Sequence, residues 1–193
     1  MRLVLTAAIL VALAVGGAAG AREARTSLHL YAPFGGSGLV EDVRVARTAH
    51  GFCRTVSPAD IRANAYRCVV GDVLQDPCFA NEIALENFVV CPLPHPGSPV
   101  LKLVLRQKLP QIPPGRDPMR YRPWAVKLAN GTWCTVVTRA TRRVAELRVA
   151  YRCTGGGVLL GTLRRTTATW SSAYARSNRA KQVNTVRIAE AWW

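Results

Sequence analysis

The chain contains few of the residues from which catalytic and metal sites are usually built. Among its 193 residues are only three histidines, His29, His50 and His95. It has no Cys-x-x-Cys or His-x-x-x-His spacing, which zinc sites typically require. We therefore expect neither a metal site nor a cofactor. Histidine can act as a general base near neutral pH, but a surface histidine is more often inert, and no catalytic residue is assigned.

Acidic residues are also scarce, with eleven Asp and Glu against 26 Lys and Arg. A secreted envelope hydrolase would need His95 or a pair of carboxylates as its general acid and base. The candidate carboxylates are Asp72, Asp76, Glu82 and Glu86. Asp72 and Asp76 flank expected turns, where side-chain capping is the ordinary role of aspartate. This hydrolase is the first alternative to a binding function.

A long apolar run occurs only within residues 1–21. A short positive start, an apolar run over residues 3–15 and the small residues Ala19-Gly20-Ala21 follow the order of a signal peptide. We expect cleavage before Arg22, export, and a secreted or cell-envelope-associated protein. An uncleaved anchor is the alternative, although its Gly and Ala content makes the run weakly hydrophobic. No later stretch is long and apolar enough to span a membrane, so the mature chain is expected to have no transmembrane span.

The six cysteines are even in number, as expected for a chain sent to an oxidising compartment. Six cysteines allow 15 connectivities. We favour sequential pairing, because each neighbouring pair brackets one short segment with a β pattern. The expected disulfides are Cys53–Cys68, Cys78–Cys91 and Cys134–Cys153. With all thiols oxidised, cysteine catalysis is not expected.

Short runs of alternating apolar and polar residues predict a mostly β protein. Such runs cover residues 43–47, 101–105, 124–128 and 147–153. Asn130-Gly131 between two of these segments favours a β-hairpin. Ser57-Pro58-Ala59-Asp60 predicts one short helix. The expected fold is an antiparallel β-sandwich or barrel-like domain with one short helix, stapled by disulfides.

Composition divides the chain into segments. Five prolines lie between residues 110 and 123, too many for regular structure. We expect a flexible N-terminal segment over 22–42, a first β half over 43–109, a Pro-rich linker or loop over 110–123, and a second, basic β half over 124–193.

Two parts of the sequence are similar to each other. A glycine and an aromatic-Cys pair, as Gly51-Phe52-Cys53 and as Gly131-Thr132-Trp133-Cys134, precede an Ala-Tyr-Arg-Cys end within residues 51–68 and 131–153. This match predicts an internal duplication, with chance as the alternative. Equivalent units would close equivalent loops, which favours the pairs Cys53–Cys68 and Cys134–Cys153 and leaves Cys78–Cys91.

Several short motifs resemble those of a group of uncharacterised exported disulfide-containing domains of actinobacterial type. They include Ala65-Tyr66-Arg67-Cys68, Gln75-Asp76-Pro77-Cys78-Phe79, Val89-Val90-Cys91-Pro92, Pro123-Trp124-Ala125, Asn130-Gly131-Thr132-Trp133-Cys134 and Tyr151-Arg152-Cys153. The resemblance covers roughly residues 45–193. The resemblance implies a fold and its disulfide bonds, and it implies no activity or ligand.

Positive charge is concentrated in the second half of the chain. Residues 22–101 carry seven Arg and eight acids, whereas residues 102–193 carry eighteen Lys plus Arg and three acids. A field of one sign favours contact with a polyanion, here an anionic envelope polymer, a membrane surface or extracellular nucleic acid. The candidate binding residues lie in three expected connections: Arg139, Arg142 and Arg143; Arg164 and Arg165; Arg176, Arg179 and Lys181. A merely solvated charged surface is the alternative.

The sequence therefore favours an exported non-catalytic module that binds an anionic envelope polymer. Besides the hydrolase, a protease-inhibitor-like module that presents the proline-rich loop 92–99 is a third possibility. Trp192 and Trp193 are further binding candidates, because exposed terminal tryptophans would suit stacking on sugars or seating at a membrane interface.

Overall fold

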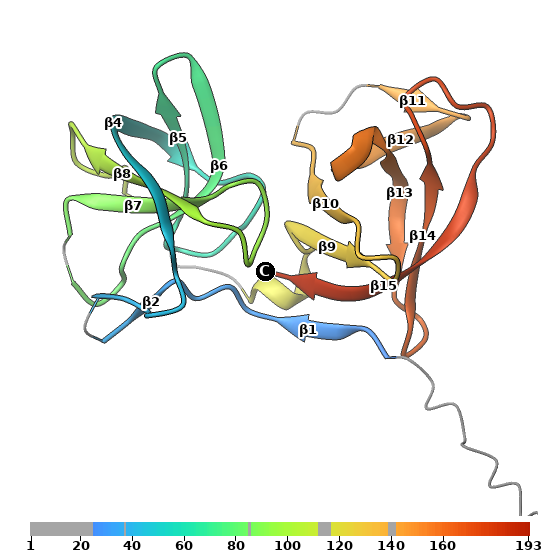
Figure 1. Ribbon diagram of the computed structural model, residues 1–193, viewed down its shortest axis with the longest axis horizontal. Coiled ribbons are helices and arrows are strands. Elements are labelled where there is room, and N and C mark those ends of the chain that lie inside the picture. The colour runs from blue at the N-terminus through green and yellow to red at the C-terminus, as the bar shows by residue number, and fades with distance from the viewer. Residues whose placement is uncertain (1–24, 37, 85, 112–116, 139–141) are drawn as a thin grey trace, which may run out of the picture.

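The computed structural model describes residues 25–36, 38–84, 86–111, 117–138 and 142–193, so the expected signal peptide over 1–21 lies outside the described residues. Strands form two closed β-barrels that lie side by side, which confirms the mostly β fold (Figure 1). We call residues 45–105 barrel 1 and residues 125–192 barrel 2.

Barrel 1 is a ring of five strands that follow one another along the chain. They are β4 (Val45–Val56), β5 (Ala65–Val70), β6 (Val73–Phe79), β7 (Phe88–Pro92) and β8 (Val100–Leu105). Consecutive strands pair antiparallel, and β8 closes the ring by pairing parallel with β4. The parallel pair follows from the count: a ring whose strands alternate in direction needs one parallel neighbour when their number is odd.

Barrel 2 contains the same kind of five-strand meander and one additional strand. Its strands are β9 (Ala125–Leu128), β10 (Trp133–Val136), β12 (Leu147–Cys153), β13 (Val158–Arg164), β14 (Trp170–Ala175) and β15 (Asn184–Trp192); the short β11 (Arg143–Val144) pairs with β12. The Asn130-Gly131 turn joins β9 to β10 as expected, with Gly131 at a φ of 85°, which glycine adopts readily. This hairpin makes the strand count even, so β15 closes the ring antiparallel to β9.

The N-terminal segment was expected to be flexible, but its described residues contact both barrels, and on the barrel 1 side the Arg62 Nη1 donates to the Tyr31 carbonyl at 2.6 Å. β1 (Ser27–His29) pairs parallel with β15, and β2 (Phe34–Gly35) pairs with β3 (Gly38–Leu39). The Thr26 hydroxyl donates to the Ile188 carbonyl at 2.7 Å, where the register of β15 against β9 shifts. Thr26 thereby satisfies a backbone acceptor of β15 and holds the start of β1 against that strand.

The short helix expected at Ser57 does not form. The Ser57 hydroxyl does accept hydrogen bonds from the backbone N–H groups of Ala59 and Asp60, as a cap would. However, β5 already begins at Ala65, and residues 57–64 form turns. Within the described residues, the helical elements are two three-residue 3-10 turns, η1 (Pro118–Arg120) and η2 (Thr154–Gly156). Along the described residues, no helix has the length and apolar character needed to cross a membrane.

The three disulfides follow the sequential order expected from the sequence. Cys53 and Cys68 face each other across β4 and β5, and Cys134 and Cys153 face each other across β10 and β12. The third disulfide joins Cys78 to Cys91, on β6 and β7. The two similar sequence segments thus occupy equivalent places in the two meanders, which supports the expected duplication.

A shared hydrophobic cluster joins the barrels. Each barrel has its own interior cluster, and a third combines Phe79 of barrel 1, Tyr31 of the N-terminal segment and Trp124 at the entrance to barrel 2. Trp124 is 1% exposed, and its ring centroid lies 6.1 Å from that of Phe79 and 5.8 Å from that of Tyr31. Burial of a large side chain stabilises a fold by roughly 1.5–3 kcal/mol, so this cluster holds the barrels together.

Candidate functional site

The cationic character of barrel 2 is not offset by acids. Residues 117–193 contain fourteen Lys and Arg and three acids. Two of these acids are already paired, Asp117 with Arg120 at 3.6 Å and Glu190 with Lys127 at 3.0 Å. Glu146 is the third acid in this range. Among the described arginines of residues 117–193, only Arg120 forms a salt bridge with a carboxylate.

Two of the three predicted cationic connections cover the same outer face of barrel 2. Val158 and Leu160 point away from the interior residue Leu159, yet each is only 1% exposed. They are covered by Val144 of β11 and by Ala180 and Val183 of the β14–β15 connection. β11 and the β14–β15 connection lie together at the upper right of Figure 1. We define the cationic wall as the exposed Lys and Arg of these two segments together with Arg148, the register partner of Arg143 on β12: Arg142, Arg143, Arg148, Arg176, Arg179 and Lys181.

Two arginines of the cationic wall face each other directly. Arg143 on β11 and Arg148 on β12 are register partners, so their side chains lie on the same face. The tight turn between them places Ala145 and Glu146 at φ values of 45° and 61°. Our sequence reasoning missed Arg148, because Ala-Glu does not have the Asn-Gly pattern that marks such a turn. Like charges placed opposite each other are destabilising, so this pair is a candidate for anion binding.

The third connection lies elsewhere. Successive turns of an up-and-down barrel alternate between its two ends, and the β13–β14 connection is at the lower end in Figure 1. There the Ala168 carbonyl accepts a hydrogen bond from the Thr26 backbone at 3.0 Å. Arg164 is exposed and faces Ser171, which in turn faces Arg187 on β15. The three connections do not gather at one end, as the sequence reasoning required for a single patch, and it also overlooked Arg187.

Arg165 differs from the other predicted residues, because it is half-buried. Its Nη2 donates to the Tyr121 carbonyl at 2.9 Å, and its guanidinium lies 4.8 Å from the ring centroid of Trp170 and 5.8 Å from that of Trp193. Burial lowers the pKa of Arg165. Arg139, the remaining predicted residue, lies outside the described residues.

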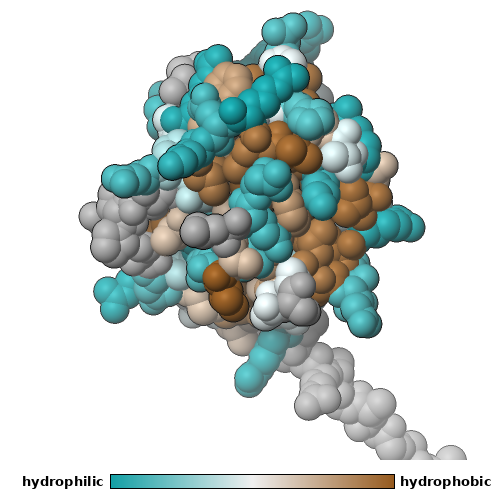
Figure 2. All heavy atoms as spheres, turned by 90° about the vertical axis from the view of Figure 1, so that its left-hand side faces the viewer, coloured by the Kyte–Doolittle hydropathy of each residue, from teal (hydrophilic) through white to brown (hydrophobic). Residues whose placement is uncertain are grey.

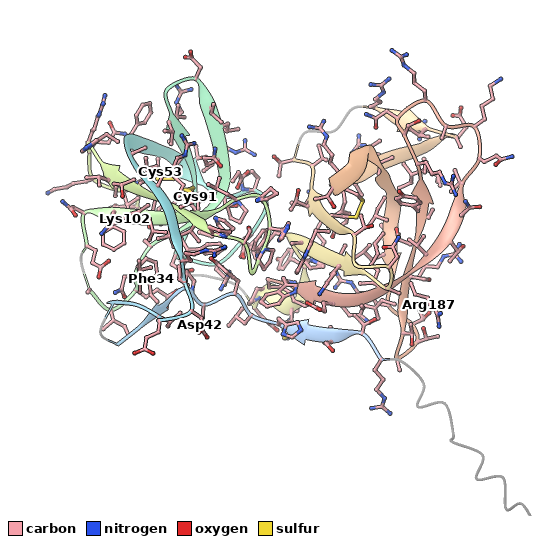
Figure 3. All side chains as sticks on the ribbon, in the orientation of Figure 1. Phe34, Asp42, Cys53, Cys91, Lys102 and Arg187 are labelled. Atoms are coloured by element: carbon pink, nitrogen blue, oxygen red, sulfur yellow. A yellow bond between two sulfur atoms is a disulfide. The ribbon has the colours of Figure 1, made fainter. Side chains whose placement is uncertain are left out.

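Barrel 1 has a different surface. Figure 2 shows its outer side, where apolar side chains are gathered between hydrophilic ones. Large apolar residues exposed in barrel 1 include Val45, Val56, Val73 and Leu74. In Figure 3, Lys102 of barrel 1 and Arg187 of barrel 2 lie on opposite sides of the molecule. The Lys102 Nζ sits 4.0 Å from the ring centroid of Phe88, so this cation is held against its own barrel.

Trp192 and Trp193 at the end of the chain do not expose their ring faces for stacking on a ligand. Trp193 is only 2% exposed, and its Nε1 donates to the Tyr121 carbonyl at 3.1 Å. Trp192 is half-buried, stacks on His29 with a centroid distance of 4.2 Å and donates through Nε1 to Glu190 at 3.1 Å. The interpretation that both are exposed is therefore wrong, because β15 carries them into the junction of the barrels.

No two of the residues considered for catalysis line the same one of four hollows in the described part of the chain. Of four hollows lined by described residues, one contains Asp42, another contains Glu86, and two contain no carboxylate. The Asp76 carboxylate accepts hydrogen bonds from the Ser57 hydroxyl and the Arg67 guanidinium. Within the described ranges, no group of three or more His, Cys, Asp or Glu side chains could hold a metal ion.

The proline-rich loop 92–99, considered as an inhibitor loop, packs against barrel 2. The His95 ring stacks on Trp133 with a centroid distance of 4.5 Å and an interplanar angle of 7°. Pro96 is buried, and the Ser98 hydroxyl donates to the His95 carbonyl. The stack on Trp133 therefore holds His95 of this loop against barrel 2.

Comparisons with protein-family models, with curated proteins and with solved structures give no match to this chain, so the resemblance to exported actinobacterial domains stays a prediction.

Proposed function

We propose that this protein is an exported, non-catalytic module that binds an anionic cell-envelope polymer through the cationic wall of barrel 2. One observation carries the proposal: Arg143 and Arg148 are register partners on a surface to which two connections contribute cations. An isolated fold gains nothing from opposing two guanidinium groups, since like charges across a strand pair are destabilising. A bound polyanion would turn this repulsion into attraction.

The position of these residues also suits a polymer. The cationic wall extends over strand connections on the outside of the barrel and is not enclosed in a pocket. A chain of phosphate or sulfate groups can follow such a surface and release its counterions as the arginines replace them. Arginine suits this role, because its planar guanidinium binds phosphate and sulfate oxygens bidentately.

Export is part of the same proposal. Three disulfides are typical of proteins that reach an oxidising compartment. In a bacterial envelope the abundant polyanions are phosphate-bearing and acidic polysaccharides, and these are the polymers that the cationic wall would meet.

The test is the retention of the purified mature chain on heparin and on teichoic acid across a salt series. The variant R142S/R143S/R148S/R179S removes four exposed charges from the cationic wall. We expect the slope of log affinity against log salt to fall by roughly 3 in magnitude, since each lost contact removes about 0.7–0.9. The thermal midpoint should hardly change, because exposed charges contribute little to stability.

The matched control is R44S/R47S/R54S/R106S, which removes four exposed arginines from barrel 1 and its borders. This control should be retained like the wild type. If the two quadruple variants lose the same retention, the polymer responds to net charge alone and the cationic wall is only a solvated surface.

A further inference from the structure

A second cationic feature of barrel 2 is concave. A hollow of about 320 Å³ lies beside η1, and three arginines line it: Arg120, Arg122 and Arg165. No acid is among the lining residues, which also include Tyr121, Ala150, Tyr151, Gly161, Thr162 and Leu163. None of the three arginines belongs to the cationic wall.

Irregular strand pairing forms one side of this hollow. Between Leu160 and Arg164, β13 has two more residues than the facing part of β14, and Gly161 within this bulge has a φ of 67°. The pairing of β12 with β13 also shifts, at Ala150. Residues of both irregularities line the hollow. Bulges leave backbone groups without ladder partners and often lie beside binding sites.

Arg165 is held in place at this site without a charged partner. Its hydrogen bond goes to a neutral carbonyl, that of Tyr121, and two tryptophan rings flank its guanidinium. Over the described ranges, Arg165 forms no salt bridge with an acid. Arg122 lies close enough that both arginines act electrostatically on Tyr151, the buried phenol of the hollow. A half-buried cation without a charged partner is unfavourable until an anion joins it.

We propose that this hollow binds the phosphate group of a small phosphorylated ligand. A phosphomonoester carries a charge of about −1.5 to −2 at neutral pH, which matches several cations better than a single carboxylate charge does. Guanidinium groups pair with its oxygens in a bidentate manner. The volume is at the lower end of small-molecule sites, so it leaves room for a compact organic group such as glycerol or one sugar.

The binding test uses isothermal titration calorimetry of the full mature chain at constant ionic strength. Glycerol 3-phosphate should bind with a stoichiometry of one, and acetate at least tenfold more weakly. Arg122→Gln and Arg165→Gln should each lower the affinity for glycerol 3-phosphate at least tenfold. Arg152→Gln is the matched control, because Arg152 is exposed on barrel 2 but does not line the hollow. This variant should bind glycerol 3-phosphate with the affinity of the wild type.

Arg122→Gln decides the test if Arg165→Gln fails to fold, because Arg122 is exposed. Wild-type affinity in Arg122→Gln, equal binding of acetate, or no binding of glycerol 3-phosphate would each overturn the proposal. A glycerol phosphate oligomer distinguishes a free ligand from the end group of a polymer. If only the oligomer binds, the free-ligand proposal is wrong.

The inference is separable from the polymer proposal. The variant R142S/R143S/R148S/R179S should bind glycerol 3-phosphate as the wild type does, even where its retention on heparin is lost. A loss of both would mean that phosphate is held by the general field of barrel 2, and the hollow would not be a site.

Discussion

Arg67 and Asp76 form a buried ion pair beside the junction of the barrels. The Nη2–Oδ2 distance is 2.7 Å, and each side chain is only 9% exposed. The Ser57 hydroxyl donates to Asp76 at 2.5 Å, and Arg67 also donates to the Thr138 hydroxyl of barrel 2 at 2.5 Å. Burial raises the pKa of Asp76, while the hydrogen bonds from Ser57 and Arg67 oppose the rise.

Replacing Arg67 by Met should destabilise the protein by about 3–5 kcal/mol at neutral pH, because it leaves a buried carboxylate without its cation. The pKa of Asp76 should then rise further, since an influence that lowers it is gone. An acid with a raised folded-state pKa favours the folded state below that pKa and loses this contribution as the pH rises through it. The deficit of Arg67→Met relative to wild type should therefore shrink on acidification. Urea denaturation between pH 4 and pH 7 measures this.

The double variant R67M/D76L serves as the control, since it removes both charges. It should be more stable than Arg67→Met alone. Additive losses, or a deficit of Arg67→Met that is independent of pH, would show that the pair is not coupled as described.

Single residues of the candidate site were only partly predictable. The sequence could point to Arg142, Arg143 and Arg179 as surface cations, because they lie in connections between strands. It could not separate Arg165 from them, because the rings and the carbonyl that hold Arg165 come from Trp170, Trp193 and Tyr121. Tyr121 and Trp193 are distant from Arg165 in the sequence, so these two contacts depend on the closed barrel and leave no local pattern.

Among the strands, the seam between β6 and β7 is the weakest ladder of barrel 1. The two strands share one register pair, Phe79 with Val90, whereas β4 and β5 share four. The disulfide Cys78–Cys91 crosses this seam next to that pair. Cys78–Cys91 should therefore stabilise its strand pair more than Cys53–Cys68 stabilises β4 and β5. The two disulfides close loops of similar length, with sequence separations of 13 for Cys78–Cys91 and 15 for Cys53–Cys68.

We expect C78A/C91A to lower the free energy of unfolding more than C53A/C68A does. Loop entropy alone assigns roughly 3 kcal/mol to each disulfide. The excess in C78A/C91A reflects the opening of the seam, and amide hydrogen exchange should show it as faster exchange in β6 and β7. Equal losses, with β6 and β7 still protected, would mean that packing and not the disulfide keeps this seam closed.

Element by element, the alternation of apolar residues was a good guide. The runs 101–105, 124–128 and 147–153 lie in β8, in and just before β9, and in β12. The parallel pairing of β4 with β8 had no local signal, because it results from closing an odd ring. The helix expected at Ser57 does not form although its cap is present, because the Asp60 carboxylate accepts a hydrogen bond from the Arg62 backbone N–H and the Ser57 N–H donates to the Ala65 carbonyl, so the chain turns directly into β5.

At the scale of the whole molecule, ring stacking supplements the shared cluster. His95 of the β7–β8 loop lies flat on Trp133 of β10. Trp133 in turn lies 6.2 Å from Trp192, measured between ring centroids, and Trp192 stacks on His29 of β1. Four rings from both barrels and from the N-terminal segment thus form one continuous row. The sequence could not predict this row, because its members come from four separate elements.

His95→Ala should lower the free energy of unfolding by about 0.5–1.5 kcal/mol through loss of the stack. The emission of Trp133 should shift to longer wavelength as its face becomes solvated. His50→Ala is the control, because His50 is exposed on β4. In a Trp133→Leu background, His95→Ala should have little further effect. The stack would be ruled out as a link between the barrels if His50→Ala and His95→Ala had equal effects on stability.

The different closures of the barrels affect how each could be moved between proteins. Ala125 and Trp192, at the first and last strands of barrel 2, are antiparallel register partners, about 5 Å apart. In barrel 1 the first residue, Val45, pairs with Val100, while the last, Leu105, pairs with Gly51, about 20 Å further along β4. Because its two ends are adjacent, barrel 2 should tolerate circular permutation, or insertion into a loop of a host protein, with short linkers. Barrel 1 would need a linker of about 20 Å to connect its first and last strands.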